Sequence, residues 1–251
     1  MNRDTSAAPH PAASADSKAL LADAVARASA NAPFLRHALE RRDDLADLLH
    51  RGDLEAALAQ ARASQDQAVP VGERLRRQKE ALSVVLAIGD LAGLLSLDQV
   101  MAGLSDFADA ALNACLSDIY ARRYPGEPVR GFGVIALGKH GGRELNYSSD
   151  IDPIFLYDPE TIPTGAREDA ASAAQRIARQ LIELMSARTE HGYVFRTDMR
   201  LRPAAEVTPL AIPVNAALSH YESQALTWEQ AAFIRARAAA GDRALGDYFM
   251  E

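Results

Sequence analysis

The chain has 251 residues, of which 48% are hydrophobic, 24% charged and 6% aromatic, and this predicts one large or two small globular domains. A formal net charge of −7 argues against a broad electropositive face, so nucleic acid is not an expected partner. A lone cysteine, Cys115, excludes a disulfide framework and a cysteine-ligated metal site. The sequence has neither a membrane-spanning apolar run nor an apolar signal core, so we expect a cytoplasmic protein without a membrane partner.

The first half of the chain carries helical patterns. Residues 1–16 are small, polar and interrupted by proline, which is typical of a disordered tail. From 17 to 123 almost every segment favours helix. The expected elements are an amphipathic stripe at 20–25 and helices near 31–41, 53–63, 71–88 and 98–122. Cys115 falls on the apolar face of the last of these and is expected in the core.

Two prolines and a glycine between Tyr124 and Pro128 mark a domain boundary. The region 124–251 then alternates strand and helix patterns, which predicts an α+β or α/β arrangement. The expected elements are strands at 129–137 and 151–157, an extended segment at 193–201, and helices at 167–187 and 215–240. An apolar cluster just before the last residue, without a stop signal, leads us to expect a catalytic domain truncated at its C-terminus.

A glycine-rich segment follows the first of these strands. Gly138, Gly141 and Gly142 can form a turn whose backbone N–H groups approach a phosphate closely, and Lys139 would add a positive charge. Such turns are most often only turns, so the pattern alone leaves both interpretations open. His140, inside the turn, is expected to be exposed to solvent.

Two aspartates stand immediately after this segment. Asp150 and Asp152 are two residues apart, so in a strand they point to the same side while Ile151 turns inward. Neighbouring carboxylates repel each other unless a cation lies between them, and Mg²⁺ takes hard oxygen ligands. An exposed polar strand edge is the alternative, but the apolar run that follows favours a buried strand and a metal site.

A third polar group lies in the extended segment. Asp198, Arg200 and Arg202 alternate with two apolar residues and so share one face. Arginine forks match phosphate oxygens, and a carboxylate beside them can complete a metal site. A charge-paired exposed strand is the alternative. Together, three carboxylates, a glycine turn and two arginines indicate metal-assisted phosphoryl or nucleotidyl transfer.

Three stretches resemble one known family. Gly138–Tyr157 (GKHGGRELNYSSDIDPIFLY) and Asp198–Pro203 (DMRLRP) are similar to signatures of the bacterial glutamine synthetase adenylyltransferase/adenylyl-removing enzymes. Trp228–Glu229, followed by Ile234–Arg237, is similar to a third. The resemblance covers about 74–245 and implies a mostly helical α+β chain, in which a helical region at 17–123 precedes a polymerase-beta-like nucleotidyltransferase domain with a small mixed sheet.

The resemblance also implies roles for individual residues. Asp150, Asp152 and Asp198 would be the catalytic carboxylates and Mg²⁺ ligands, although Asp198 could instead only orient the attacking oxygen. The residues that would contact nucleotide or phosphate are Gly138, Lys139, Gly141, Gly142, Ser149, Arg200 and Arg202. Four departures from the family pattern occur, at His140, Pro153, Ala204–Ala205 and Gln230, and the one after Arg202 puts that loop in doubt.

These enzymes contain two such domains, and Asn146–Asp150 resembles the N-terminal copy. That copy removes AMP from a tyrosine of glutamine synthetase, with inorganic phosphate as acceptor and ADP as product. The implied partners are glutamine synthetase, ATP or ADP, inorganic phosphate and a PII-type signalling protein. Forward adenylylation with ATP, or an inert fragment that only binds a partner, are the alternatives. A basic cluster at Arg74, Arg76 and Arg77 is interpreted as a solvated face, with a docking patch as the alternative.

Overall fold

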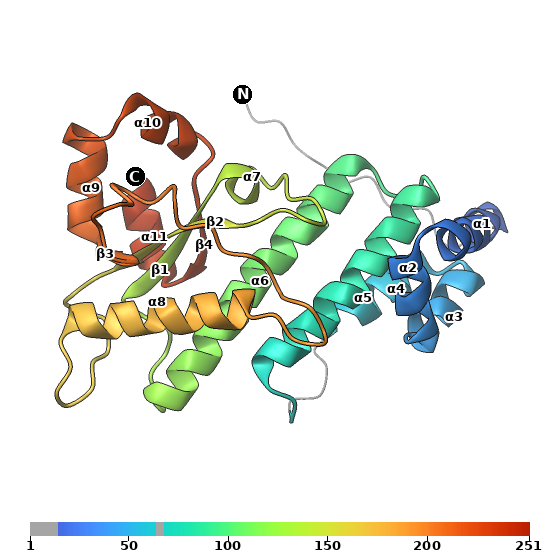
Figure 1. Cartoon of the computed structure of the whole chain (residues 1–251), viewed down its shortest axis with the longest axis horizontal. Coiled ribbons are helices and arrows are strands. Elements are labelled where there is room, and N and C mark those ends of the chain that lie inside the picture. The colour runs from blue at the N-terminus through green and yellow to red at the C-terminus, as the bar shows by residue number, and fades with distance from the viewer. Residues whose placement is uncertain (1–14, 64–67) are drawn as a thin grey trace. The chain divides into compact units, whose positions relative to one another are not determined.

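The computed structural model describes residues 15–63 and 68–251. Most of the predicted tail lies outside the described residues, but Ala15 and Asp16 already belong to the first helix. Figure 1 shows the elements in chain order. The helices are α1 (Ala15–Asn31), α2 (Pro33–Glu40), α3 (Asp43–Arg51), α4 (Leu54–Arg62), α5 (Val71–Leu91), α6 (Leu97–Arg123), α7 (Gly138–Gly141), α8 (Ala170–Ser186), α9 (Val214–Ser223), α10 (Thr227–Phe233) and α11 (Arg243–Met250). The strands are β1 (Phe132–Leu137), β2 (Asp152–Tyr157), β3 (Ala211–Pro213) and β4 (Arg237–Gly241).

The chain divides into two compact units. One consists of the described residues up to Ala63 together with Glu80–Leu97, and the other contains the described part of 64–79 together with Asp98–Glu251. This division differs from the predicted boundary at residue 124, because α6 belongs with the sheet. The Tyr120 hydroxyl donates to the Arg130 carbonyl at 2.7 Å, one of the contacts that attach α6 to the sheet unit. In the described ranges, no helix combines the length and apolar character needed to cross a membrane.

The first unit is helical, as predicted, but it contains one helix more than the patterns distinguished. Gly52, with φ of +87°, ends α3, and the Asp53 carboxylate then accepts a hydrogen bond from the Ala56 N–H at 2.9 Å and begins α4. A Cβ at Gly52 would lie 2.9 Å from the Lys18 Cα, so the turn also permits close packing against α1.

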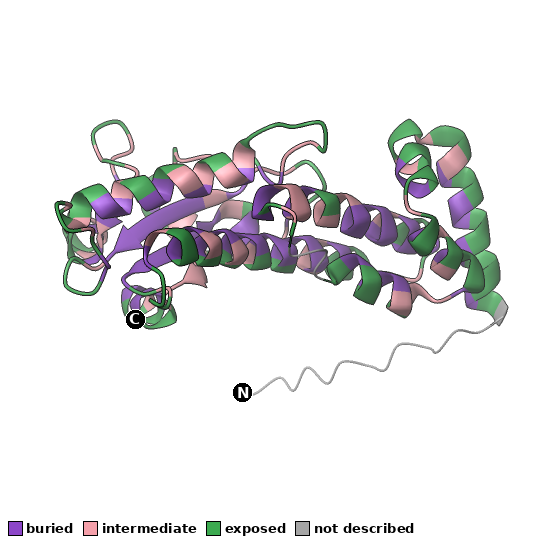
Figure 2. Ribbon diagram, turned by 90° about the horizontal axis from the view of Figure 1, so that it is seen from below, coloured by how far each residue is buried: buried purple, intermediate pink, exposed green. Residues whose placement is uncertain are grey.

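The second unit is built on a mixed sheet with strand order β3-β2-β1-β4. β1 pairs antiparallel with β2 and β4, whereas β2 and β3 are parallel. One face of the sheet packs against α9 and α11, through Ile135, Ile154 and Phe249 among others. β1 and the apolar part of β2 are buried. Figure 2 shows that the helices, in contrast, have exposed residues on the side that faces solvent. The predicted α+β class with a small mixed sheet is therefore confirmed.

Two predicted elements are wrong in part. The segment 193–201 is not a regular strand, because only Thr197 forms a ladder contact, with Ile151. The helix expected at 215–240 divides into α9 and α10, and its last residues form β4 instead. The alanine-rich Arg237–Gly241 favours helix locally, but pairing with β1 supplies backbone hydrogen bonds that outweigh this propensity.

Candidate active site

The glycine turn follows β1 directly and lies against the D-x-D segment. Gly138 has φ of +56°, and a Cβ there would lie 2.6 Å from Asp152 Oδ2, so both conformation and space require glycine. A Cβ at Gly141 would lie 2.1 Å from the Arg235 carbonyl oxygen. Close approaches within the fold thus explain two of the three glycines. Lys139 is exposed on this turn, and Gly142 ends it.

The two aspartates of the D-x-D segment flank a buried residue. Asp152 opens β2 and pairs with Leu137, the last residue before the glycine turn. Ile151 is fully buried, whereas Asp150 and Asp152 are both partly exposed. The predicted inward turn of Ile151 is therefore correct, and both carboxylates lie at the end of the sheet where the glycine turn begins.

A short parallel bridge brings the third carboxylate to this place. The Ile151 N–H donates to the Arg196 carbonyl at 3.0 Å, and the Asp198 N–H donates to the Ile151 carbonyl at 2.8 Å. Thr197, between them, is the residue that pairs with Ile151. Two hydrogen bonds thus position Asp198 beside the D-x-D segment without a full strand.

The surroundings of Asp152 disfavour the charged form of its carboxyl group. Burial and the nearby carboxylates of Asp198 and Asp150 together raise the pKa of this carboxyl to about 6, against the opposing effects of Arg200 and Lys139. Mutual repulsion of this kind shows that the three acids sense each other electrostatically. The same repulsion makes the group receptive to a cation.

Two arginines hold the other two carboxylates. Arg196 Nε donates to Asp150 Oδ1 at 2.5 Å. Arg200 Nε donates to both carboxylate oxygens of Asp198, at 2.9 and 2.8 Å, and lowers the pKa of that carboxyl. The Arg200 side chain is 87% exposed. Its guanidinium can therefore leave Asp198 for another anion at little loss, because exposed ion pairs are weak.

Arg202 and Ser149, the other predicted phosphate ligands, are engaged locally. Arg202 donates from Nη1 to the Met199 carbonyl at 2.7 Å and from Nη2 to the Ala205 carbonyl at 2.5 Å. Ser149 Oγ donates to Asn146 Oδ1 at 2.9 Å. In this arrangement Arg202 shapes the loop after the arginine segment, and Ser149 closes the turn before Asp150.

The acids have the donor chemistry that Mg²⁺ prefers, but they are not arranged as a finished metal site. No three acidic, histidine or cysteine side chains among the described residues are grouped to hold a metal ion as they stand. Arg196 and Arg200 form ion pairs with two of the carboxylates, whereas burial and these two neighbouring carboxylates raise the pKa of the third, Asp152. Carboxylate oxygens of this kind fit Mg²⁺ once the arginines release them.

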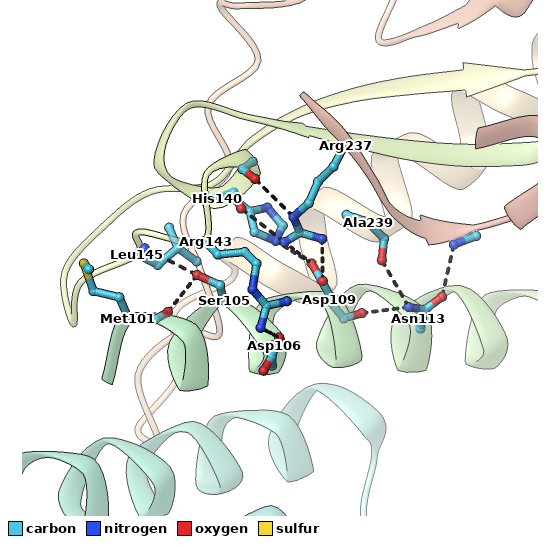
Figure 3. A network of polar contacts seen from close by, with 12 residues as sticks. Met101, Ser105, Asp106, Asp109, Asn113, His140, Arg143, Leu145, Arg237 and Ala239 are labelled. Carbon is cyan, nitrogen blue, oxygen red and sulfur yellow. Dashed lines mark hydrogen bonds and ion pairs between the residues drawn. The ribbon is translucent and has the colours of Figure 1, made fainter. Parts of the chain in front are cut away.

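Sequence reasoning missed a partly buried network behind the glycine turn (Figure 3). His140 is fully buried, so its predicted exposure is wrong, and its Nε2 donates to Asp109 Oδ1 at 2.7 Å. Arg237 donates to the same carboxylate from Nη1 at 2.6 Å and from Nη2 at 3.0 Å. Burial raises the pKa of Asp109, but these hydrogen bonds outweigh that effect and leave it below its usual value.

The sequence provided some indication of Arg237 and Arg196, but none of Asp109. Arg237 stands in one of the quoted family-like stretches, and Arg196 lies two residues before Asp198, so both were within reach. Asp109 gave no signal, because an aspartate on a long helix normally faces solvent. Only the tertiary structure places Asp109 opposite the glycine turn.

The predicted basic cluster does not form one face. Arg76 is buried and donates to the Ala187 carbonyl from Nε at 3.1 Å and from Nη2 at 2.8 Å, near the end of α8. Arg77 instead pairs with Glu73 on its own helix. Neither the solvated face nor the docking patch is therefore correct for Arg76, which has a structural role. Cys115 is fully buried, as predicted.

A small mixed sheet that carries acidic residues beside a glycine turn is the arrangement that the sequence resemblance implies for a nucleotidyltransferase. Comparison with known families agrees, since the glutamate-ammonia ligase adenylyltransferase family matches residues 16–251. The chain belongs to this family.

Curated relatives carry the name bifunctional glutamine synthetase adenylyltransferase/adenylyl-removing enzyme. One from Rhizobium meliloti is 40% identical over 227 residues, which cover 85% of this chain and 22% of the relative. Another from Caulobacter vibrioides is 43% identical, over 78% of this chain and 21% of the relative. A third from Agrobacterium fabrum is 39% identical, over 92% of this chain and 26% of the relative. The chain thus spans about a quarter of the length of these relatives or less.

Proposed function

We propose that this chain carries an adenylyl-removing site, which releases AMP from a tyrosine of adenylylated glutamine synthetase by attack of inorganic phosphate. The observation that carries the proposal is the convergence of Asp150, Asp152 and Asp198 beside the glycine turn, in a chain of this family. The names of the relatives include both adenylyltransferase and adenylyl-removing activities. The resemblance of Asn146–Asp150 to the N-terminal copy supports the removing direction.

The reaction exchanges one phosphorus–oxygen bond for another. A phosphate oxygen attacks the phosphorus of the tyrosyl-AMP, the bond from phosphorus to the tyrosyl oxygen breaks, and a proton returns to the phenolate. The products are ADP and unmodified tyrosine. In such transfers the protein mainly positions the reactants and neutralises charge.

The residues of the chain divide these tasks. Asp150, Asp152 and Asp198 would hold Mg²⁺, which when bound supplies positive charge to the phosphate oxygens. Arg200, exposed beside them, would contact the phosphate, and Lys139 would contribute a second positive charge from the glycine turn. Arg202 would act by holding the loop, through its bonds to backbone carbonyls.

Phosphorolysis of AMP-modified glutamine synthetase tests the proposal directly. The purified chain is mixed with the modified synthetase, Mg²⁺ and phosphate, and ADP is followed over time. We expect ADP from the native chain and none from the Asp150→Asn variant. Equal ADP release by both proteins would disprove the assignment of the carboxylates.

Two other outcomes identify the alternatives. Transfer of label from ATP to unmodified glutamine synthetase, without phosphorolysis, would assign the forward reaction to this chain. Binding of glutamine synthetase or a PII-type protein by an Asp150→Asn/Asp152→Asn double variant, with neither reaction in the native chain, would assign a partner-binding role.

A further inference from the structure

The Asp109 network contacts the backbone of the glycine turn itself. Besides its bonds to Asp109, Arg237 donates from Nε to the Gly141 carbonyl at 3.2 Å and from Nη2 to the His140 carbonyl at 3.1 Å. These carbonyls end the single turn of α7, and the His140 carbonyl also accepts a hydrogen bond from the Arg143 N–H at 3.2 Å. The guanidinium therefore joins the end of the turn to an acidic side chain of α6 (Figure 3).

The same turn is confined from the side of β4. Arg237 pairs with Ala136 of β1, two residues before the turn begins at Gly138. The segment that precedes it lies so close that a Cβ at Gly141 would meet the Arg235 carbonyl oxygen at 2.1 Å. His140, fully buried, anchors the turn to α6 through Asp109. The turn is thus held by α6, β1 and the start of β4 together.

Holding this turn also determines its distance from the carboxylates. Gly138, at the other end of α7, approaches Asp152 so closely that a Cβ would lie 2.6 Å from Asp152 Oδ2. Since α7 is only four residues long, a displacement of its last carbonyls moves Gly138 as well. An error of about 1 Å in such positioning can lower a rate about 100-fold.

We propose that Arg237, oriented by Asp109, is a positioning residue that holds the Gly138–Gly142 backbone in register with Asp152. The inference rests on the proposed function for its kinetic consequence, although the structural part stands without it. Arg237 forms its ion pair with Asp109 rather than with the candidate carboxylates Asp150, Asp152 and Asp198, so it is not itself a catalytic residue. Lysine is a poor substitute, because an ammonium group cannot serve two carbonyls and a carboxylate in the planar geometry of a guanidinium.

A matched control lies elsewhere in the same unit. Arg123 is 29% exposed and pairs at 2.6 Å with the Glu168 carboxylate, whereas Arg237 is 23% exposed and pairs at 2.6 Å with Asp109. Arg123→Gln therefore removes a comparable ion pair that does not contact the glycine turn. The test variants are Arg237→Gln and Arg237→Lys, with Asp109→Asn as a milder change that retains the shape of the side chain.

Two measurements then decide the proposal. In ¹⁵N-labelled protein, we expect Arg237→Gln to shift the amide resonances of Gly138, Gly141 and Gly142, and Arg123→Gln to leave them in place. By calorimetry with ADP and Mg²⁺, we expect affinity to fall at least about tenfold in Arg237→Gln, and less than about twofold in Arg123→Gln. Arg237→Lys should behave like Arg237→Gln, and Asp109→Asn should shift the same amides less.

Unchanged glycine resonances in a folded Arg237→Gln protein would overturn the proposal, as would full recovery in Arg237→Lys. If Arg237→Gln does not fold, the glycine resonances of Asp109→Asn decide in its place. Failure of the native chain to bind ADP would count against the proposed function, whereas the amide shifts would still decide the role of Arg237.

Discussion

Asp109 and Asp152 are both partly buried aspartates near the glycine turn, yet their surroundings are opposite. Asp109 accepts hydrogen bonds from His140 and Arg237, which outweigh burial and lower its pKa. Asp152 faces two further carboxylates, and burial with their repulsion raises its pKa to about 6. A carboxylate in a structural network is neutralised by its own chain, whereas one at the candidate active site is left with its charge uncompensated.

The different surroundings of Asp109 and Asp152 indicate that the first contributes to stability and the second to the proposed function. A partly buried ion pair such as Asp109–Arg237 resists loss of either partner, because the remaining charge would lose its counter-charge. A cluster of like charges destabilises the fold unless a bound cation or substrate neutralises it. Active sites often carry such a loss of stability because their activity requires it. Substitutions at the two aspartates should therefore have opposite effects on the free energy of unfolding.

The largest effect should be on turnover at Asp152. We expect Asp152→Asn to lower phosphorolysis at least about 1,000-fold, because charge neutralisation by a metal contributes several kcal/mol and each 1.4 kcal/mol is about tenfold in rate. ADP release with saturating Mg²⁺ measures it. Asp106→Asn, which removes an exposed ion pair with Arg143 instead, serves as the control and should retain the native rate.

The second prediction is that substitution of Asp109 lowers the stability of the protein. Asp109→Ala should lower the free energy of unfolding by roughly 2–4 kcal/mol, because it strands the charge of Arg237 and a buried His140 nitrogen. Urea unfolding at pH 7.5 measures the change. Asp47→Ala, at an exposed pair with Arg51, should show no measurable change. An equally small effect at Asp109 would remove the distinction between the two kinds of aspartate.

The third prediction is that substitution of Asp152 raises the free energy of unfolding instead of lowering it. Because the folded pKa of Asp152 lies above its unfolded value, the native state binds more protons and loses stability as the pH rises from about 4 to 6. Without divalent cations, Asp152→Asn should therefore be more stable than the native chain at pH 7.5 by about 1 kcal/mol, after allowance for solvent screening. The difference should disappear below about pH 4, and urea unfolding at both pH values checks it.

The smallest effect concerns the arginine of the exposed pair. Arg200→Ala should leave the stability unchanged within error, since its side chain is 87% exposed and its ion pair with Asp198 is at the surface. It should nevertheless raise the KM for phosphate, because the guanidinium would contact the attacking anion. Thermal unfolding and initial rates at varied phosphate separate the two. A clear loss of stability would show that Arg200 is structural, as Arg237 is.

Much of the candidate site could be predicted from local patterns. The glycine segment, the D-x-D spacing and the acidic residue of DMRLRP each carry chemistry in their residue types, and alternation along an extended chain indicates which side chains share a face. β1 and β2 were also predictable, because they are short apolar runs bounded by turn residues. The extra helix α3 and the split of 215–240 were not, since helix propensity does not report where tertiary pairing ends a helix.

Residue types at short spacings were sufficient to predict the fold class and the family, and they single out three aspartates as the candidate carboxylates. The burial of His140, the hydrogen bonds of Arg237 and the placement of α6 with the sheet follow from tertiary contacts. His140 bonds Asp109 across 31 positions and Arg237 bonds Asp109 across 128, and local periodicity cannot relate residues so far apart. Bonds between distant segments, such as those from Ile151 to its partners, also decided that Asp198 would reach the first two aspartates.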